Sequence, residues 1–484
     1  MRSASFIDDV RARWYRFRLD RSVRALPLEL VADSGARADK ESSAFRRYAR
    51  ELERYIAVLE DIRRRGPSFV GRFQELRLEK LLRRAAASAY WRSVFERSGV
   101  NPGDIRRLAD LARIPPVGRT GLIDVPRDAS ATEKLPDNAV YWMRSSGSTT
   151  GTPFIWGSYA WDWPLAVWSY HLRELDARGF SLATSAHRDF LFQINYGGGN
   201  AVFQMFFIEN FRLRPRGDAA EEDARAIVAA IEEVGPSVLL CNPTELASFL
   251  HALDALGRQP PMTGCLLVGQ PIEEAFQEHA ERLLGCPVIP YYSTMETAAI
   301  GAGCRHAPGR YHTYAERVIV EILDDAGRQV ADGERGNITV TCLDNLFMPL
   351  IRYQPGDVGT LRHRVSCPCG NPNPLLEVEG RSVDVIRFAD GSAESVRRVF
   401  KLLAADPFLT RIRRMQVRQE ELGTLRILLE PRDAILGPAV IRELKKRIDV
   451  LYEGKIRVTV EEVREIDPGT KKFKAFVPLA PRTR

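Results

Sequence analysis

The chain has 484 residues, 45% of them hydrophobic and 27% charged, which is typical of a globular protein with two or more domains. It has no run of about 18 apolar residues, so we expect no membrane span. Its net charge of +7 is mild and follows no basic stripe, so we expect no nucleic-acid partner. The charged N-terminus has no apolar signal core and the seven cysteines are an odd number, which favours a cytoplasmic protein with reduced thiols.

The first part of the chain is predicted to be helical. Residues 1–75 are a helical extension, in which Phe45–Arg64 carries apolar residues at helical spacing. The helical pattern continues over Glu75–Phe95, and a short helix is expected at Ile105–Leu111.

A polar loop follows, built only from serine, threonine and glycine. It comprises Ser145, Ser146, Gly147, Ser148, Thr149, Thr150 and Gly151. Its hydroxyls and its glycine-rich backbone suit the phosphates of a nucleotide, while the same composition is also found in flexible linkers. The loop has neither the Walker A pattern nor the dinucleotide-binding G-x-G-x-x-G.

After this loop, helices and strands alternate. Beyond an aromatic helix at Trp161–Leu175, we expect four strands (Asp189–Ile194, Ser237–Cys241, Cys265–Val268 and Val288–Tyr291) and three helices (Glu221–Val234, Glu245–Leu256 and Ile272–Leu284). This rhythm predicts a parallel sheet with helices on its faces, whose ligands bind beyond the carboxyl ends of the strands. The loops at Asn195, Asn242, Gly269 and Tyr292 fall at such ends.

The alternation of helices and strands gives way to a series of strands beyond Tyr311. Strands at Arg317–Leu323, Asn337–Leu343 and Thr360–Arg364 suggest a mixed section. The last part has helices at Glu394–Ala404 and Pro438–Leu451, and strands at Arg413–Arg418, Thr424–Glu430 and Lys455–Glu461. The expected fold class is therefore α/β: a large N-terminal domain of helix-flanked parallel and mixed sheets (1–380), and a small, mobile α+β lid domain (381–484).

Four further segments, with the polar loop, occur in a characteristic order. They are Tyr291–Glu296 (YYSTME), Pro349–Gly359 (PLIRYQPGDVG), Gly380–Asp384 (GRSVD) and Asp467–Lys474 (DPGTKKFK). Together they resemble the adenylate-forming superfamily of acyl-CoA synthetases, adenylation domains and luciferases. The resemblance is closer to its phenylacetate–CoA ligase branch, including capsular-polysaccharide-type homologues, and covers roughly residues 75–478.

The resemblance implies an ATP- and Mg²⁺-dependent ligase and assigns roles to individual residues. The polar loop would hold the phosphates, Tyr292 with Gly269, Gln270 and Pro271 would line the adenine pocket, and Asp357 would bind the ribose. Thr294 stands in for the hydroxyl that the family places before Glu296, and Glu296 would hold Mg²⁺. Arg381 would contact the ribose or phosphates, and Lys472 would reach the substrate carboxylate and the α-phosphate.

This chain departs from the family pattern in places that bear on its function. The polar loop has one extra residue, and Met295 and Val383 replace a hydroxyl residue and an acidic residue. Lys471 replaces a glycine, which leaves it as an alternative to Lys472. Phe388-Ala-Asp-Gly-Ser replaces the loop that helps CoA ligases to admit the thiol, so the acceptor is either CoA or an amine, carrier protein or other nucleophile.

Cys367-Pro-Cys369 and Cys304-Arg-His306 form two pairs of potential zinc ligands. The resemblance implies a structural zinc held by Cys304, His306, Cys367 and Cys369, with His312 as an alternative to His306; free thiols are the other interpretation. The remaining cysteines lie among apolar residues and suit a core.

The acyl pocket is expected around Tyr196, Gly197 and Tyr291, and its aromatic residues favour an aromatic acid as substrate. A non-catalytic, nucleotide-binding relative is the third functional class considered, and retention of Glu296, Asp357 and the lysines disfavours it. A homodimer is compatible with the sequence.

Overall fold

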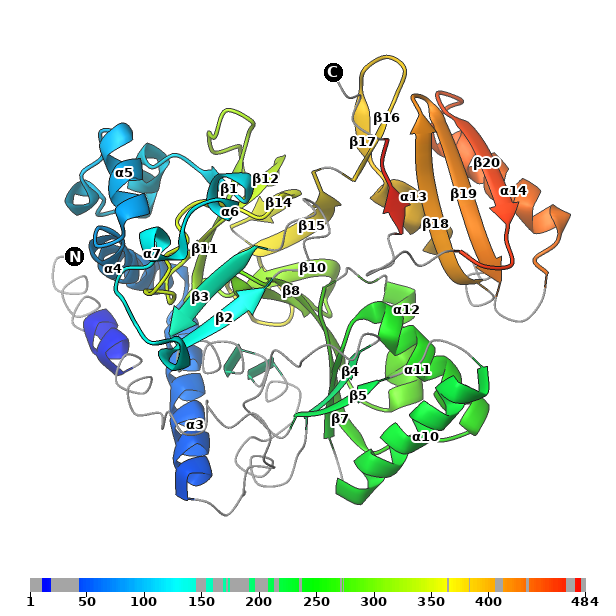
Figure 1. Cartoon of the computed structure of the whole chain (residues 1–484), viewed down its shortest axis with the longest axis horizontal. Coiled ribbons are helices and arrows are strands. Elements are labelled where there is room, and N and C mark those ends of the chain that lie inside the picture. Colours follow the sequence, from blue (N-terminus) through cyan, green and yellow to red (C-terminus); the bar gives the residue numbers. More distant parts are fainter. Residues whose placement is uncertain are drawn as a thin grey trace. The chain divides into compact units, whose positions relative to one another are not determined.

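The computed structural model of the chain divides into two compact units (Figure 1). One contains residues 1–355 and 360–377, and the other contains residues 356–359 and 378–484. The structure describes residues 11–18, 43–144, 154–159, 169–170, 173–174, 191–195, 208–212, 217–234, 237–269, 272, 274–363, 365–382, 384–404, 412–431, 435–466 and 475–479.

A long mixed sheet organises the larger unit. Its strand order is β1-β13-β12-β14-β15-β10-β9-β8-β7-β6-β4-β5, and β11 pairs with β12. One part is parallel, with β4 (Leu191–Asn195), β5 (Ile208–Arg212), β6 (Ser237–Cys241), β7 (Met262–Leu267) and β8 (Val288–Thr294). The parallel sheet predicted from the alternating elements is therefore present.

The antiparallel part of the sheet begins where β8 turns back. β9 (Ala298–Cys304) pairs with β8, and β10 (Ala307–Thr313) pairs with β9 and with β15 (Leu375–Arg381). The remaining strands are β1 (Val117–Gly118), β11 (Val318–Leu323), β12 (Arg335–Cys342), β13 (Tyr353–Gln354) and β14 (Asp357–Arg362). A separate antiparallel pair is formed by β2 (Val140–Arg144) and β3 (Ile155–Tyr159).

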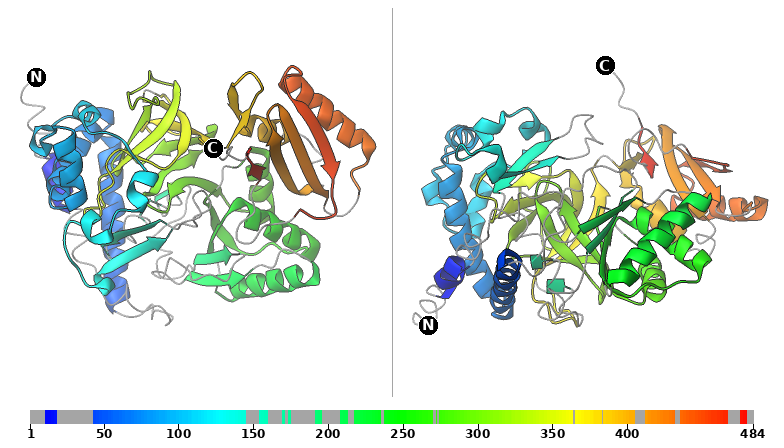
Figure 2. Two further views of the ribbon diagram at one scale, coloured as in Figure 1. Left: turned by 45° about the horizontal axis from the view of Figure 1, so that its top comes forward. Right: turned by 60° about the horizontal axis from the view of Figure 1, so that its bottom comes forward.

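Helices cover both faces of the parallel strands (Figures 1 and 2). On one face lie α10 (Gly217–Val234), α11 (Pro243–Leu256) and α12 (Glu274–Leu284), and on the other lie α3 (Ser43–Arg64) and α4 (Pro67–Ala85). Successive side chains of β6 enter different cores: Val238 and Leu240 pack on the α3–α4 side, and Leu239 on the other. A strand buried on both faces reads as a continuous apolar run, as Ser237–Cys241 does.

Short elements connect the N-terminal helices to the sheet. They are α5 (Ala89–Arg97), η1 (Pro102–Asp104), η2 (Leu108–Arg113), α6 (Thr120–Ile123), α7 (Arg127–Ser130) and η3 (Asp137–Ala139). The indole N–H of the fully buried Trp91 donates to the Pro349 carbonyl at 2.9 Å. This bond fixes α5 against the chain that follows β12.

The smaller unit contains a four-stranded sheet of order β20-β19-β18-β21. Its strands are β18 (Ile412–Glu421), β19 (Thr424–Pro431), β20 (Arg457–Glu462) and β21 (Phe476–Val477), and its helices are α13 (Arg397–Ala404) and α14 (Pro438–Leu451). β16 (Val385–Arg387) and β17 (Ala393–Ser395) form a hairpin. The predicted α/β fold class, with a smaller α+β part, is confirmed.

Some predicted elements were wrong in detail. Glu394 lies in a strand rather than in a helix, because it pairs with Ile386 across the β16–β17 hairpin. β8 does not end near Tyr292 but continues to Thr294, because β9 pairs with its last residues. The strands β9, β10 and β15 were not predicted. Among the described residues, no helix is long and apolar enough to cross a membrane.

Candidate active site

The predicted magnesium ligand Glu296 lies at the tip of the β8–β9 hairpin. Thr294 and Ala298 are paired across a three-residue turn, and Glu296 in that turn is only 5% exposed. The Thr294 hydroxyl accepts a hydrogen bond from the Thr297 backbone N–H at 3.1 Å, and Ala298 has a left-handed φ of 58°. The turn therefore fixes the backbone on both sides of a buried carboxylate.

An arginine that the sequence analysis did not single out lies beside Glu296. Arg119 precedes α6, and its Nη1 is 3.8 Å from Glu296 Oε1. The same guanidinium lies 5.8 Å from the centroid of the Phe154 ring, just after the polar loop. Arg119 thus lies between the hairpin and the chain that follows the predicted phosphate loop.

Of the residues predicted to bind adenine and substrate, the three that the structure describes lie at the carboxyl ends of parallel strands. Gly269 follows β7 and has a φ of 88°, a conformation that favours glycine. Tyr292 in β8 is 8% exposed, with its ring centroid 6.0 Å from that of Tyr311, and Tyr291 is 2% exposed. Because β7 and β8 are parallel neighbours, their carboxyl ends meet at one edge of the sheet.

The predicted ribose residue and the predicted junction arginine form an ion pair. Arg381 Nε is 3.0 Å from Asp357 Oδ1, and the Asp357 side chain is 9% exposed. The Ser382 backbone N–H donates to the Gly356 carbonyl at 2.8 Å, which holds the two segments together. The sequence prediction that Asp357 and Arg381 serve one site is consistent with this pairing.

Several predicted site residues lie outside the described part of the chain. They are the polar loop from Ser145 to Gly151, Tyr196, Gly197, Gln270, Pro271, Val383, Lys471 and Lys472.

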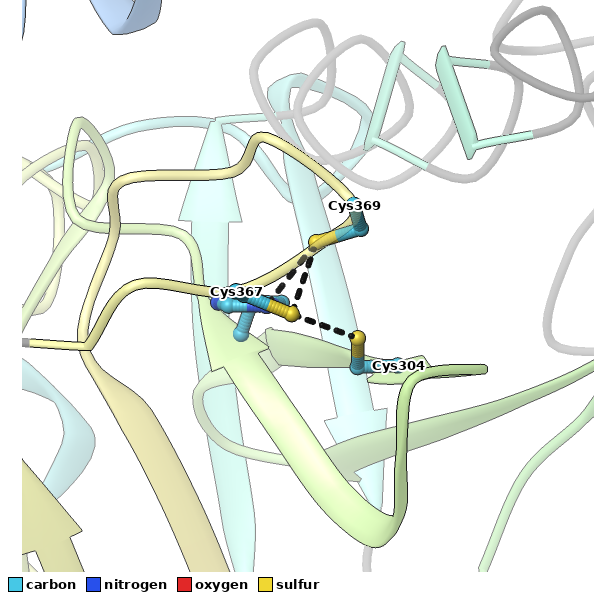
Figure 3. Close-up of side chains that lie close together, drawn as sticks. Cys304, Cys367 and Cys369 are labelled. Carbon is cyan, nitrogen blue, oxygen red and sulfur yellow. Dashed lines mark hydrogen bonds between the residues drawn. The ribbon is translucent and has the colours of Figure 1, made fainter.

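A second cluster brings together three cysteines and a histidine. Cys304 ends β9, His312 lies in β10, and Cys367 and Cys369 lie in the loop before β15. Their ligand atoms all lie within 4.8 Å of one another. The sulfur of Cys367 is 3.4 Å from that of Cys304 and 3.2 Å from that of Cys369. Figure 3 shows the three cysteine side chains pointing toward one another. The Cys369 sulfur is 3.2 Å from His312 Nε2.

The fourth member of this cluster is His312, the alternative that the sequence left open, and not His306. His306 is exposed in the two-residue turn between β9 and β10. His312 pairs with Ala302, which places it on the face of the hairpin that carries Cys304. The adjacency of Cys304 and His306 in sequence was misleading, because the turn carries His306 away from the sulfurs.

Backbone N–H groups reach all three sulfurs of the cluster, and burial shifts the pKa values of its members. The backbone N–H of His306 donates to the Cys304 sulfur, that of Cys369 to the Cys367 sulfur, and that of Asn371 to the Cys369 sulfur. Burial raises the pKa of Cys304 to about 12 and also raises that of Cys369, whereas the pKa of Cys367 is lowered by its hydrogen bonds despite its burial. Burial lowers the pKa of His312, which favours the neutral form of its imidazole.

His312 is oriented by a hydrogen bond that leaves Nε2 free to face the sulfurs. Its Nδ1 lies 3.0 Å from the backbone carbonyl of Asn373, which places the ring proton on Nδ1. The Asn373 side chain in turn donates to Glu316 at 3.2 Å, and Glu316 forms an ion pair with the buried Arg173. Arg173, which no sequence pattern predicted as part of a site, also lies 4.8 Å from the Tyr314 ring centroid.

Solved structures identify the class to which this fold belongs, although no family model matches the chain. The fold is that of the adenylate-forming CoA ligases. A crystal structure of 2-hydroxyisobutyryl-CoA ligase in the postadenylation state, in complex with R3-HIB-AMP, is similar with a TM-score of 0.69. The two chains are 18% identical, and the similarity covers 84% of this chain and 89% of that one.

Proteins similar to this chain in sequence carry the name of one branch of this class, the phenylacetate–CoA ligases. The chain is 24% identical over 306 residues to a phenylacetate–coenzyme A ligase of Aromatoleum evansii, covering 61% of this chain and 67% of that protein. It is also 26% identical over 322 residues to the phenylacetate–coenzyme A ligase of Thermus thermophilus, and this match covers 64% of this chain and 70% of that protein. The expected resemblance to the phenylacetate–CoA ligase branch is confirmed, and the chain is an adenylate-forming ligase related to these enzymes.

Proposed function

We propose that the protein activates a carboxylic acid with ATP and transfers the resulting acyl group to CoA. The observation that carries the proposal is Glu296, a buried carboxylate on a fixed hairpin at the edge where the parallel strands end. It occurs in a chain whose relatives bear the names of CoA ligases and whose structural neighbour has been solved with an acyl-adenylate and CoA. We further propose an aromatic acid as substrate, bound near Tyr196, Gly197 and Tyr291.

In the first step, an oxygen of the substrate carboxylate attacks the α-phosphorus of ATP. The bond from that phosphorus to the bridging oxygen breaks, and pyrophosphate leaves. Both reactants are anions, so positive charge near the phosphates lowers the barrier. Arg119 supplies such charge beside Glu296, and Lys472 or Lys471 would supply more.

Glu296 fits a magnesium ligand, because Mg²⁺ prefers carboxylate oxygens and binds through few protein groups together with phosphate. When bound, Mg²⁺ would neutralise phosphate charge. The residues of the polar loop, from Ser145 to Gly151, would hold the phosphates by hydroxyls and backbone N–H groups. Gly269, Gln270, Pro271 and Tyr292 would enclose the adenine, with Thr294 close by, and Asp357 with Arg381 would hold the ribose.

In the second step, a thiolate attacks the acyl carbon, the bond to the phosphate oxygen breaks, and AMP leaves. One observation supports an amine or a carrier-protein thiol as an alternative acceptor. The segment Phe388–Ser392, where CoA ligases have a thiol-admitting loop, is a tight turn between β16 and β17, and Phe388 is 2% exposed.

We propose that Cys304, His312, Cys367 and Cys369 hold a structural Zn²⁺. Three sulfurs and one imidazole nitrogen complete a tetrahedral set and leave no open position for a substrate. A tetrahedral ion with sulfur bonds of about 2.3 Å separates its ligands by about 3.8 Å, so the sulfurs need to move apart by only a few tenths of an ångström. The N–H donors to each sulfur and the carbonyl that orients His312 are the expected outer shell.

Acid-dependent exchange of pyrophosphate into ATP tests the proposal. A panel of aromatic, amino-aromatic and short aliphatic acids should give exchange with at least one acid, and Glu296→Gln should lower the rate about 10²–10³-fold by analogy with lost transition-state donors. Glu232→Gln is a matched control, because Glu232 is an exposed carboxylate paired with Arg258 on the helical face of the unit. Adding CoA and then candidate amines distinguishes the acceptors. Nucleotide binding without exchange by any acid would support the non-catalytic class instead.

A further inference from the structure

Arg317 is a buried cation at the base of the Glu296 hairpin. It follows β10 in the turn before β11, and the whole residue is 2% exposed. Its Nη1 donates to the carbonyl of Thr297 at 2.6 Å and to that of Ala299 at 2.7 Å. The guanidinium therefore binds the backbone on both sides of Ala298, the residue with the left-handed φ.

The same guanidinium is joined to a second segment. Arg317 Nε lies 2.7 Å from Asp344 Oδ2, and the Arg317 carbonyl accepts the Leu343 N–H at 2.9 Å. Next to Asp344, the Asn345 side chain donates to the Gly157 carbonyl at 3.0 Å, and the Trp156 indole donates to the Met348 carbonyl at 2.9 Å. This segment thus holds β3, the strand that follows the polar loop.

We infer that Arg317 is a positioning residue that sets the Glu296 carboxylate relative to the strand leaving the phosphate loop. The inference rests on the proposed function and adds to it a residue that touches neither nucleotide nor metal. A left-handed, non-glycine residue such as Ala298 persists only where its surroundings hold it, and the two hydrogen bonds from Arg317 are such a restraint. Without them the turn can relax, and Glu296 loses its fixed position for the cation.

The alternative is that Arg317 only stabilises the core, so the test must measure metal binding and stability separately. Binding of Mn²⁺ in the presence of ATP is measured by electron paramagnetic resonance, and thermal unfolding is recorded for the same samples. Arg317→Met should weaken Mn²⁺ binding about 10- to 100-fold, the range found for groups that orient metal ligands. Arg317→Lys keeps the positive charge and should lose less Mn²⁺ affinity than Arg317→Met. It is the second variant to measure if Arg317→Met does not fold.

Arg352→Lys is the matched control. Arg352 is 1% exposed and bound to Glu321 and to the Ile114 carbonyl, with no hydrogen bond to the Glu296 hairpin among the described residues. The Arg352→Lys variant should have a lower melting temperature and an unchanged Mn²⁺ affinity. Combining Arg317→Met with Glu296→Gln should add little to the loss from Glu296→Gln alone, because the two residues act through one carboxylate.

Unchanged Mn²⁺ affinity in Arg317→Met, or additive losses in the double variant, would overturn the inference. Equal effects of Arg317→Lys and Arg352→Lys on Mn²⁺ affinity would also overturn it. Equilibrium binding needs no turnover, so a wild-type protein that binds Mn²⁺ with ATP but exchanges no pyrophosphate refutes the proposed function and not the role of Arg317.

Discussion

Replacement of His312 or His306 by alanine distinguishes the histidine in the metal cluster from the one next to Cys304 in sequence. His312 Nε2 faces the Cys369 sulfur at 3.2 Å, whereas His306 is exposed in a turn. We expect His312→Ala to release zinc and His306→Ala to retain one equivalent. The His306 backbone N–H bond to the Cys304 sulfur survives that substitution, because it does not involve the side chain.

The expected loss of zinc affinity in His312→Ala follows from the number of ligands. Structural zinc in small domains contributes about 10–16 kcal/mol of apparent binding free energy, so one of four ligands corresponds to roughly 2.5–4 kcal/mol, or about 10²–10³-fold in affinity. Replacing an exposed side chain such as His306 usually changes stability by less than about 0.5 kcal/mol.

The assay is competition with a chromogenic zinc chelator, together with metal analysis of the purified proteins. Loss of zinc from His306→Ala with retention in His312→Ala would refute the ligand set drawn from the structure. A wild-type protein with less than about 0.3 equivalents of zinc would refute the metal site altogether.

Three further predictions concern local features. The metal-free protein should lose stability as the pH falls below about 6.5, because folding lowers the pKa of His312 and favours its neutral form; this dependence should be weaker in His312→Ala, measured by urea unfolding across pH. Ala298→Gly should change the free energy of unfolding by less than about 1 kcal/mol, whereas Ala298→Val should cost more than about 2 kcal/mol, since a β-branched residue does not tolerate a φ of 58°. Asn242→Ala should cost about 1 kcal/mol in thermal unfolding, because the Asn242 side chain accepts the N–H groups of Thr244 and Glu245; no loss would contradict the assigned cap.

Most of the parallel part of the fold could be predicted from its apolar strands, but β5 was not, because its sequence carries Glu209, Asn210 and Arg212. Ser237–Cys241 and Val288–Tyr291 are continuous apolar runs, and the helices between them have a clear apolar face. β9 could not be found in this way. Its sequence, Ala298–Cys304, is rich in alanine and glycine, residues that are depleted in strands. It forms because the glycines allow close packing: a Cβ on Gly301 would lie 2.6 Å from the His312 carbonyl oxygen.

The order of the family-like segments predicts Glu296, Asp357 and Arg381 as site residues, and these assignments stay predictions. The residues that support them through tertiary contacts have no such signal in the sequence. Arg317 has no such signal, because an arginine after a strand is usually solvated, and only the folded chain surrounds it with Thr297, Ala299 and Asp344. The identity of the histidine ligand likewise depended on a turn between two strands that the sequence did not reveal.

The two proposed metal sites lie at opposite ends of one strand, and this arrangement separates their roles. β9 begins beside the Glu296 turn and ends at Cys304, and its seven residues span roughly 20 Å at about 3.4 Å each. That distance exceeds the range over which a charge acts in physiological salt, about 8 Å, so the zinc cluster can influence Glu296 only through the position of the strand. The strand is held independently along its length, by the pairing of Tyr291 with Ala302 and by the close approach of Gly303 to Pro290. Zinc removal should therefore lower the melting temperature while the protein that remains folded keeps its Mn²⁺ affinity, whereas loss of Arg317 should change that affinity directly.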